Sequence, residues 1–336
     1  MNKQRRVLTG ITTTGVPHLG NLVGAILPAI KASEQKDTIS FLFLADYHSL
    51  IKNFDSELRH QSSFDIAACW LACGLDPTKV IFYRQSDVPH IFELAWILSC
   101  LASKGLLNRA HAYKAAISDN QANKIEDIDK GINMGLFNYP ILMAADILMF
   151  KADLVPVGQD QKQHIEMTRD IALKFNHHYG EILTPPEAVI DENTGVLPGV
   201  DGRKMSKSYK NIIPIFSEEK ALRKVIMKIQ TNSLEPGEPK DTSDSNIFEI
   251  YQAIGSKEKV NELQKLYQEG ISWSEAKEIL FEELNSFLKP FKSEYEKIVK
   301  DKSFVERTLL EGSEKALSVS EPIIKEIRQA LGIKGF

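Results

Sequence analysis

The segment Thr9–Gly24, with the sequence TGITTTGVPHLGNLVG, combines glycines with an imidazole and an amide at close spacing. The pattern predicts a strand that passes through a Gly- and Thr-rich turn into a helix beginning near His18. Glycines let backbone N–H groups approach a ligand, and a helix N-terminus favours an anion. Because His18 and Asn21 are three residues apart, both can face that ligand. The segment has neither a Walker A loop nor the GxGxxG spacing, and a capped helix start explains it equally well.

A second candidate is the basic run Arg203–Ser208, RKMSKS, which follows the glycines of LPGVDG. These flanks predict a flexible loop. Lys204 and Lys207 are three residues apart, and lysines act as point charges on phosphate groups. Met205 and Ser206 lie between them. The loop can therefore close on a polyphosphate, with a solvated basic loop as the alternative.

The apolar stretch Asn138–Phe150 is interrupted by a single acid. On a helix, Tyr139, Met143 and Asp146 fall on one face. Burying an ionised carboxylate costs several kcal/mol unless it is paired or hydrogen-bonded, so Asp146 needs a partner. That partner is either structural, such as an arginine or a helix cap, or a ligand N–H donor such as an indole.

Polar side chains also gather where two predicted strands end. The run Ile39–Ala45 has no polar alternation, as expected of a strand covered on both faces, and Asp46 and His48 follow it. Residues Asp153–Arg169 predict a short strand, a turn at Gly158 and a helix. Ligands bind beyond the carboxyl ends of such strands. A capped surface helix does not easily explain the five polar residues near this turn, which are Gln159, Asp160, Gln161, Gln163 and His164.

Short β-rich runs alternate with longer helical patterns over the first 170 residues. This rhythm predicts an α/β fold with a doubly wound, Rossmann-like parallel sheet. From about Asn246 the chain has helical patterns rich in Lys and Glu, after an irregular loop at Ser233–Ser245. We expect an α/β domain over residues 1–215 and a helical domain over residues 216–336, whose last helix packs back on the first domain. The predicted strands are Arg6–Ile11, Ile39–Ala45 and Val80–Tyr83, and the predicted helices are Leu22–Ser33, Glu57–Cys73 and Ile91–Ser103.

The 336 residues are 43% hydrophobic and 26% charged, as in a globular protein with a sizeable core. The net charge of −4 gives no global basic field, so a nucleic-acid partner would need a local patch. Residues 203–228 hold eight basic and two acidic side chains, whereas residues 246–336 hold 14 basic and 16 acidic ones. The first of these segments is the better candidate for phosphate contact, with a solvated helix face as the alternative.

The three cysteines, Cys69, Cys73 and Cys100, form no CxxC pair, which argues against a disulfide framework or a zinc site. Cys69 and Cys73 share an apolar helix face and are expected to be buried and reduced. The basic N-terminus lacks an apolar signal core, and no apolar run approaches the roughly 18 residues needed to span a bilayer. We expect a cytoplasmic protein with no membrane partner.

The HLGN segment near the N-terminus and KMSKS about 190 residues later resemble the paired signature motifs of class I aminoacyl-tRNA synthetases. YPILMAADIL and VPVGQDQKQH are similar to tryptophanyl-tRNA synthetases, and the resemblance covers the α/β half nearly end to end and the helical third more weakly. It implies a ligase that activates L-tryptophan with ATP, releases pyrophosphate and transfers tryptophan to the 3′ end of tRNA(Trp), whose anticodon region would meet the helical domain. The alternatives are a tyrosyl-tRNA synthetase, a small nucleotidyltransferase, and a non-catalytic paralogue, which should have lost His18 or the lysines of KMSKS.

The resemblance also implies a role for each matching position. Asp146 would accept a hydrogen bond from the indole N–H, with Tyr139 and Gln161 near the amino group. Leu8 and Thr12 stand where the best-known bacterial members carry Phe and Gln, so the contacts of these two positions stay open. The tryptophan pocket would be lined by Leu8, Gly10, His48, Tyr139, Met143, Asp146, Val155, Val157 and Gln161. ATP would contact Thr12, Gly20, Gly158, Asp160, Met205 and Ser206, and the catalytic groups would be His18, Asn21, Lys204 and Lys207.

The same resemblance sets expectations for cofactors and assembly. ATP would enter as its Mg²⁺ complex, with no metal ligand supplied by the protein. The iron–sulfur cluster that some family members carry near the C-terminus is excluded, because no cysteine follows Cys100. The family is dimeric, so we expect a homodimer.

Overall fold

The computed structural model describes residues 4–13, 15–35, 37–51, 53–190 and 197–333, apart from the side chain of Asp160. Five strands form one parallel sheet in the order β3-β2-β1-β4-β5, which confirms the predicted doubly wound fold. The strand order reverses beside β1, where such sheets leave a crevice for ligands. The strands are β1 (Arg5–Thr12), β2 (Thr38–Ala45), β3 (Ile81–Arg84), β4 (Leu154–Pro156) and β5 (Glu187–Val189).

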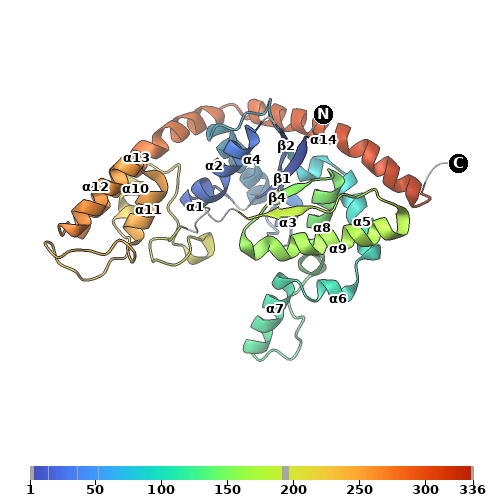
Figure 1. Cartoon of the computed structure of the whole chain (residues 1–336), viewed down its shortest axis with the longest axis horizontal. Helices are drawn as coiled ribbons and strands as arrows, with labels where there is room; N and C mark the ends of the chain where they lie inside the picture. Colours follow the sequence, from blue (N-terminus) through green and yellow to red (C-terminus); the bar gives the residue numbers. More distant parts are fainter. Residues whose placement is uncertain (1–3, 14, 36, 52, 191–196, 334–336) are drawn as a thin grey trace.

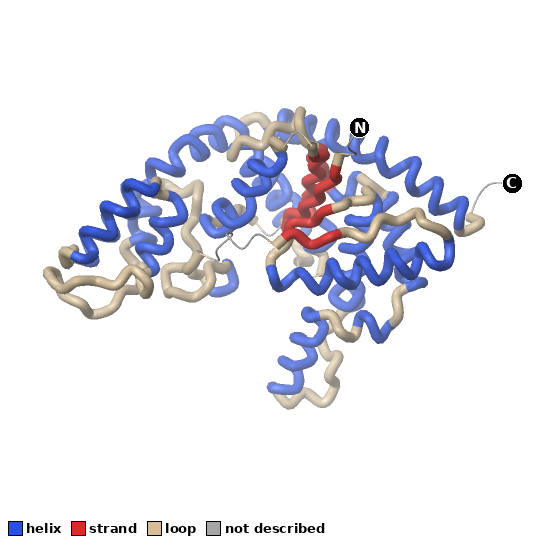
Figure 2. Tube along the Cα trace, viewed as in Figure 1, coloured by secondary structure: helices blue, strands red, loops and turns tan. Residues whose placement is uncertain are grey.

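Helices cover both faces of this sheet, and the strands lie between them (Figure 2). Leu42 and Leu44 of β2 join one hydrophobic core, whereas Phe41 and Phe43 join the other. An uninterrupted apolar strand is therefore buried on both faces, as its sequence predicts. The first core includes residues of α4 (Ser56–Ala72), and the second includes residues of α5 (His90–Leu101), α8 (Met134–Met149) and α9 (Lys162–Tyr179).

The first helical segment of the chain has a wide turn near its start. A short α1 (Leu19–Asn21) runs into a π-helical turn, η1 (Leu22–Ile26), and then into α2 (Leu27–Ser33). Pro28 lacks an N–H, and its ring crowds the carbonyl group four residues earlier, so a wider turn before it relieves the clash. His18 is the N-cap, which places the helix start where the sequence predicts it.

Beyond residue 215, the described chain consists of helices joined by loops, and Ser233–Ser245 lies in a loop as predicted. α13 packs against both α4 and α11, which joins this region to the first core. α14 runs along the molecule (Figure 1), and it packs across β3. The helices are α10 (Glu219–Ile226), α11 (Asn246–Ile254), α12 (Lys257–Gln268), α13 (Trp273–Ile298) and α14 (Lys302–Ala330).

The crossing of α14 over β3 leaves no room for a side chain at Gly312. A Cβ atom added there would lie 1.7 Å from the carbonyl oxygen of Phe82. Since that oxygen belongs to a strand, it cannot move aside cheaply. The glycine therefore fixes how closely the last helix approaches the sheet.

Shorter elements connect these layers. α3 (Asp46–Ser49) follows β2 directly, and the 3₁₀ turn η2 (Gln85–Asp87) follows β3. α6 (Lys104–Leu107) leads to α7 (His111–Ala122), which projects from the body of the molecule (Figure 1). None of the helices described is both long enough and apolar enough to cross a membrane.

Candidate active site

A cavity of about 760 Å³ opens beside the carboxyl ends of β1, β2 and β4. Its position matches the crevice expected where the strand order reverses. It contains side chains from both halves of the sheet, although β2 ends at Ala45 and β4 begins only at Leu154. All nine residues predicted for the tryptophan pocket line it, together with two of those predicted for ATP, namely Leu8, Gly10, Thr12, His48, Tyr139, Met143, Asp146, Val155, Val157, Gly158 and Gln161.

Asp146 is the buried acid of this cavity, with 1% of its surface exposed. His48 Nε2 lies 2.9 Å from Asp146 Oδ2, and Gln85 Nε2 donates to Asp146 Oδ1 at 2.7 Å. The partner that the sequence requires is therefore a pair of side chains, and it is neither an arginine nor a helix cap. Burial raises the pKa of Asp146, while the hydrogen bonds from His48 and Gln85 oppose this rise.

Tyr139 and Gln161 form a second polar group in the cavity wall. The Tyr139 hydroxyl donates to Gln161 Oε1 at 3.0 Å. The ring of Tyr139 meets the rings of His48 and His164 edge-on, with centroid distances of 5.7 and 4.8 Å. These contacts fix the aromatic ring, so its hydroxyl and the amide of Gln161 have defined positions for a polar ligand group.

The polar residues after β4 do not all serve this cavity. Gln161 lines it, and His164 packs behind Tyr139. Gln163 instead accepts from the backbone N–H of His111 and donates to the Arg109 carbonyl, which ties α9 to the start of α7. The predicted ATP contact Asp160 has a side chain that lies outside the described residues.

His18 and Asn21 cap the helix start reciprocally. Asn21 N–H donates to His18 Nδ1 at 3.4 Å, and His18 N–H donates to Asn21 Oδ1 at 3.1 Å. Burial, with a smaller contribution from the charge of Lys207, lowers the pKa of His18 to about 4. The imidazole is therefore neutral near pH 7, and because Nδ1 accepts, the ring proton sits on Nε2. The capped helix start is present, and it leaves Nε2 of His18 and Nδ2 of Asn21 as the donors suited to a phosphate.

The loop around KMSKS packs against this turn. Met205 is buried, and its sulfur accepts from Gly20 N–H at 3.4 Å. Lys207 Nζ donates to the Gly15 carbonyl at 2.8 Å, and burial lowers the pKa of Lys207. The structure thus brings together two motifs that the sequence separates widely.

The other two predicted residues of this loop are placed differently. Ser206 donates through its backbone N–H to Asn211 Oδ1 at 2.8 Å, and its hydroxyl lies 2.8 Å from that of Ser208. Lys204 is exposed, and it is bridged to Pro198 through its backbone. Of the two lysines, Lys207 is therefore the one that points at the His18 turn.

Comparison with known proteins shows which family the chain belongs to. Residues 1–289 match the tRNA synthetases of class I (W and Y). The tryptophan–tRNA ligase of Neisseria meningitidis is 52% identical over 98% of both chains, and that of Xanthomonas campestris is 52% identical over 99% of this chain and 78% of its own. The tryptophanyl-tRNA synthetase of Campylobacter jejuni, solved with ADP and tryptophan, is 41% identical, with a TM-score of 0.88 over 97% of this chain and 99% of its own. The chain belongs to the tryptophanyl-tRNA synthetase family.

Two of the alternatives that the sequence left open, a tyrosyl-tRNA synthetase and a small nucleotidyltransferase, fit these comparisons less well. A tyrosyl-tRNA synthetase from Aeropyrum pernix has a TM-score of 0.67 at 19% identity, a likeness that concerns the fold alone. A small nucleotidyltransferase would not need the helical third, whereas the match to the Neisseria ligase extends over 98% of this chain.

Gln85 is the residue of this site that the sequence analysis missed. It is fully buried, and it holds the acid of the cavity. Its position directly after β3 is the signal that could have found it, since polar residues that end buried strands of a parallel sheet face the ligand edge.

Proposed function

We propose that the chain activates L-tryptophan with ATP, forming tryptophanyl-adenylate and pyrophosphate, and then transfers tryptophan to the 3′ end of tRNA(Trp). The observation that carries this proposal is a buried carboxylate, Asp146, in an otherwise largely apolar cavity. An indole combines a large apolar surface with one N–H donor, and such a cavity complements both. The names of the relatives, tryptophan–tRNA ligases, support the same choice.

In this proposal the indole enters the cavity with its N–H directed at Asp146. A carboxylate offers about four lone-pair sites, and His48 and Gln85 use two of them. Tyr139 and Gln161 then lie at the amino group of the substrate. The remaining pocket positions supply apolar contact, and they are Leu8, Gly10, Met143, Val155 and Val157.

Selection against phenylalanine rests on the indole hydrogen bond and on contact area. If the indole were the only donor to Asp146, phenylalanine would leave that carboxylate unpaired. In the structure two protein donors already satisfy that carboxylate, so the cost of the unfilled position is smaller. The lost indole bond and the smaller ring still penalise phenylalanine.

Activation begins when a carboxylate oxygen of tryptophan attacks the α-phosphorus of ATP. The bond from that phosphorus to the bridging oxygen breaks, and pyrophosphate leaves. No protein nucleophile is needed, so catalysis consists of positioning and of stabilising charge on the phosphates. We assign that charge stabilisation to His18, Asn21, Lys204 and Lys207, with Mg²⁺ entering as part of the ATP complex.

ATP itself is assigned to the turn where the two motifs meet. Thr12 and Gly158 line the cavity, and Gly20 and Met205 contact each other beside it. Asp160 and Ser206 belong to this group by their family positions. In the second reaction, the terminal ribose 2′-hydroxyl of tRNA attacks the carbonyl carbon of the adenylate, and AMP leaves.

Lys207 gives a direct test of the phosphate assignment. Lys207→Ala should slow single-turnover formation of the adenylate about a hundredfold, because one positive charge near the leaving phosphates is lost. Tryptophan binding, measured by fluorescence titration, should change less than about twofold. Lys220→Ala removes an exposed lysine on α10 and serves as the control. Normal single-turnover activation by Lys207→Ala would exclude the role.

The proposal also covers where the chain is located and how it assembles. We assign the cytoplasm as its location and a homodimer as its assembly, with an exposed aromatic group as the candidate contact. Trp96 of α5 is 73% exposed, and the ring of Tyr47 packs on Phe92, one helical turn before Trp96, at a centroid distance of 4.1 Å.

For tRNA, the basic residues between 203 and 228 remain the candidate surface. Three of these side chains are already engaged within the chain, which leaves fewer of them for tRNA phosphates. Arg203 pairs with Asp201, Arg223 pairs with Glu278, and Lys207 points inward.

The experiment that tests the function is pyrophosphate exchange measured with each of the twenty amino acids in turn. Tryptophan alone should stimulate exchange strongly, and tRNA charging should follow with the same amino acid. Stimulation by tyrosine instead would show that the chain is a tyrosyl-tRNA synthetase. Stimulation by no amino acid would refute the proposal.

A further inference from the structure

Gln85 occupies an unusual position behind the acid of the cavity. It is 0% exposed, and it donates from Nε2 to Asp146 Oδ1 at 2.7 Å. Its Oε1 accepts from the backbone N–H of Tyr47 at 3.2 Å. A carboxylate only accepts and a backbone N–H only donates, so the amide can take one orientation. Gln85 therefore joins Asp146 to the start of α3, the helix that carries His48.

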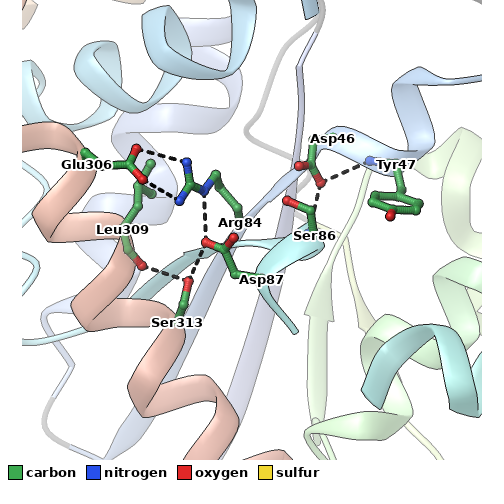
Figure 3. Close-up of polar contacts among 8 residues, drawn as sticks. All are labelled: Asp46, Tyr47, Arg84, Ser86, Asp87, Glu306, Leu309 and Ser313. Atoms are coloured by element: carbon green, nitrogen blue, oxygen red, sulfur yellow. Dashed lines mark hydrogen bonds and ion pairs between the residues drawn. The ribbon is translucent and has the colours of Figure 1, made fainter. Parts of the chain in front are cut away.

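The turn that carries Gln85 is fastened to α3 a second time. Ser86 N–H donates to Asp46 Oδ1 at 3.1 Å, and the same oxygen accepts from Tyr47 N–H at 3.0 Å (Figure 3). As a result, the two residues that hold Asp146 come from two short segments that are pinned to each other. A shift of one segment would move both of them.

α14 holds this turn from the other side. Arg84 donates to both carboxylate oxygens of Glu306, at 2.9 and 2.7 Å, and to Asp87 Oδ2 at 2.9 Å (Figure 3). The Ser313 hydroxyl donates to the same oxygen of Asp87 at 2.9 Å. The residues on both sides of the Gln85–Ser86 pair are thus tied to the C-terminal helix, next to the close approach at Gly312.

We propose that Gln85 is a positioning residue for indole recognition, and that α14 holds it in place through Arg84 and Asp87. This inference rests on the proposed function and extends it. With Oδ1 occupied by Gln85 and Oδ2 by His48, the Asp146 carboxylate cannot rotate, so its remaining lone pairs point in fixed directions. Loss of Gln85 frees that rotation and leaves one oxygen without its donor.

The test compares tryptophan with its benzothiophene analogue, in which sulfur replaces the indole N–H. Gln85→Met keeps the length of the side chain and removes both hydrogen bonds. In pyrophosphate exchange, this variant should raise KM for tryptophan about tenfold, with kcat changed less than about twofold. The analogue makes no N–H bond, so its KM, or its inhibition constant against tryptophan, should change less than about twofold.

Two results would overturn the inference. An equal rise for tryptophan and the analogue would mean that Gln85 only shapes the cavity, and an unchanged KM for tryptophan would mean that it does not act on the site. A wild-type protein that tryptophan does not stimulate would refute the proposed function, and this inference with it, before any variant is measured.

The contribution of α14 has a matched pair of variants. Glu306 and Glu326 both lie on α14, are 52% and 49% exposed, and pair with Arg84 and Lys151 respectively. Glu306→Ala should raise KM for tryptophan two- to threefold and leave the analogue unchanged, whereas Glu326→Ala should alter neither. Equal effects of the two variants would remove α14 from the proposal. Because both positions are at the surface, this comparison still tests the support of the Gln85 turn by α14 if Gln85→Met fails to fold, and Gln85→Glu, which keeps the acceptor but loses the donor to Asp146, then tests Gln85 itself with the same two ligands.

Discussion

In this site, the protonation of individual side chains depends on burial as much as on neighbouring charges. Asp146 and His18 are buried and Lys207 is half-buried, and in each case burial is the largest cause of the pKa shift. For His18 and Lys207 the shift favours the neutral form, which costs no desolvation. The proposed phosphate site therefore offers a neutral imidazole donor beside a partly desolvated lysine.

The pH dependence of stability tests the buried state of His18. Its pKa is about 4 in the folded chain and about 6.5 in an unfolded one, so the unfolded chain binds more protons between these values. The free energy of unfolding should then fall as pH decreases through this range, by about 2–3 kcal/mol from this group. Urea denaturation of wild type and His18→Gln at several pH values measures the difference.

The matched control for this comparison is His60→Gln, which removes an exposed imidazole. The same decrease in wild type and in His18→Gln would contradict a buried, neutral histidine.

The sequence predicts the surroundings of a side chain only where they depend on burial or on residues close in the chain. The need of Asp146 for a partner follows from burial alone, and the helix start at His18 follows from its own neighbours. The identity of Gln85 as that partner depends on β3 lying two strands away from β1, which no local pattern contains.

At the scale of elements, apolar runs predict the central strands well, and short edge elements less so. The predicted strand Arg6–Ile11 appears as β1 with one more residue at each end. β5 was not predicted, because its three residues have no apolar run and are ordered by pairing with β4. The π turn η1 was also missed, since the sequence shows Pro28 but not how the helix accommodates it.

The close contact between α14 and β3 can be tested by its effect on the free energy of unfolding. Gly312→Ala places a methyl group 1.7 Å from the Phe82 carbonyl oxygen, so it should lower the free energy of unfolding by about 3 kcal/mol. Gly105→Ala, in α6, is the control, because an added Cβ there meets nothing within 4 Å. Thermal and urea denaturation of both variants should separate them. Similar stability of Gly312→Ala and wild type would show that the helix and strand can separate at little cost.

Across the whole molecule, the helical region meets the α/β domain where α14 crosses β3 and where α13 packs against α4. The loop around KMSKS packs against the His18 turn, and just beyond that loop Leu19 N–H donates to the Ile213 carbonyl at 2.9 Å. The family resemblance predicted the pairing of the two motifs, and the expected packing of the last helix on the first domain appears as the contact of α14 with β3.

Assembly is the property of the whole molecule that a single substitution tests. In the proposed homodimer, Trp96→Asp should weaken association about thirtyfold, because a large exposed aromatic residue is a common anchor of an interface. Sedimentation velocity over a range of concentrations measures the shift from dimer to monomer. Leu310→Asp replaces another exposed apolar residue, on α14, and should leave the dimer intact. A Trp96→Asp protein that dimerises like wild type would place the contact elsewhere.

Recognition of the indole N–H of tryptophan by Asp146 is the contact on which the proposed function most depends. The most direct measurement is kcat/KM for tryptophan and KM for ATP in pyrophosphate exchange by wild type and Asp146→Ala. We expect kcat/KM for tryptophan to fall about a hundredfold, while KM for ATP stays within about twofold and shows that the fold is intact. An unchanged KM and rate with tryptophan would contradict the claim.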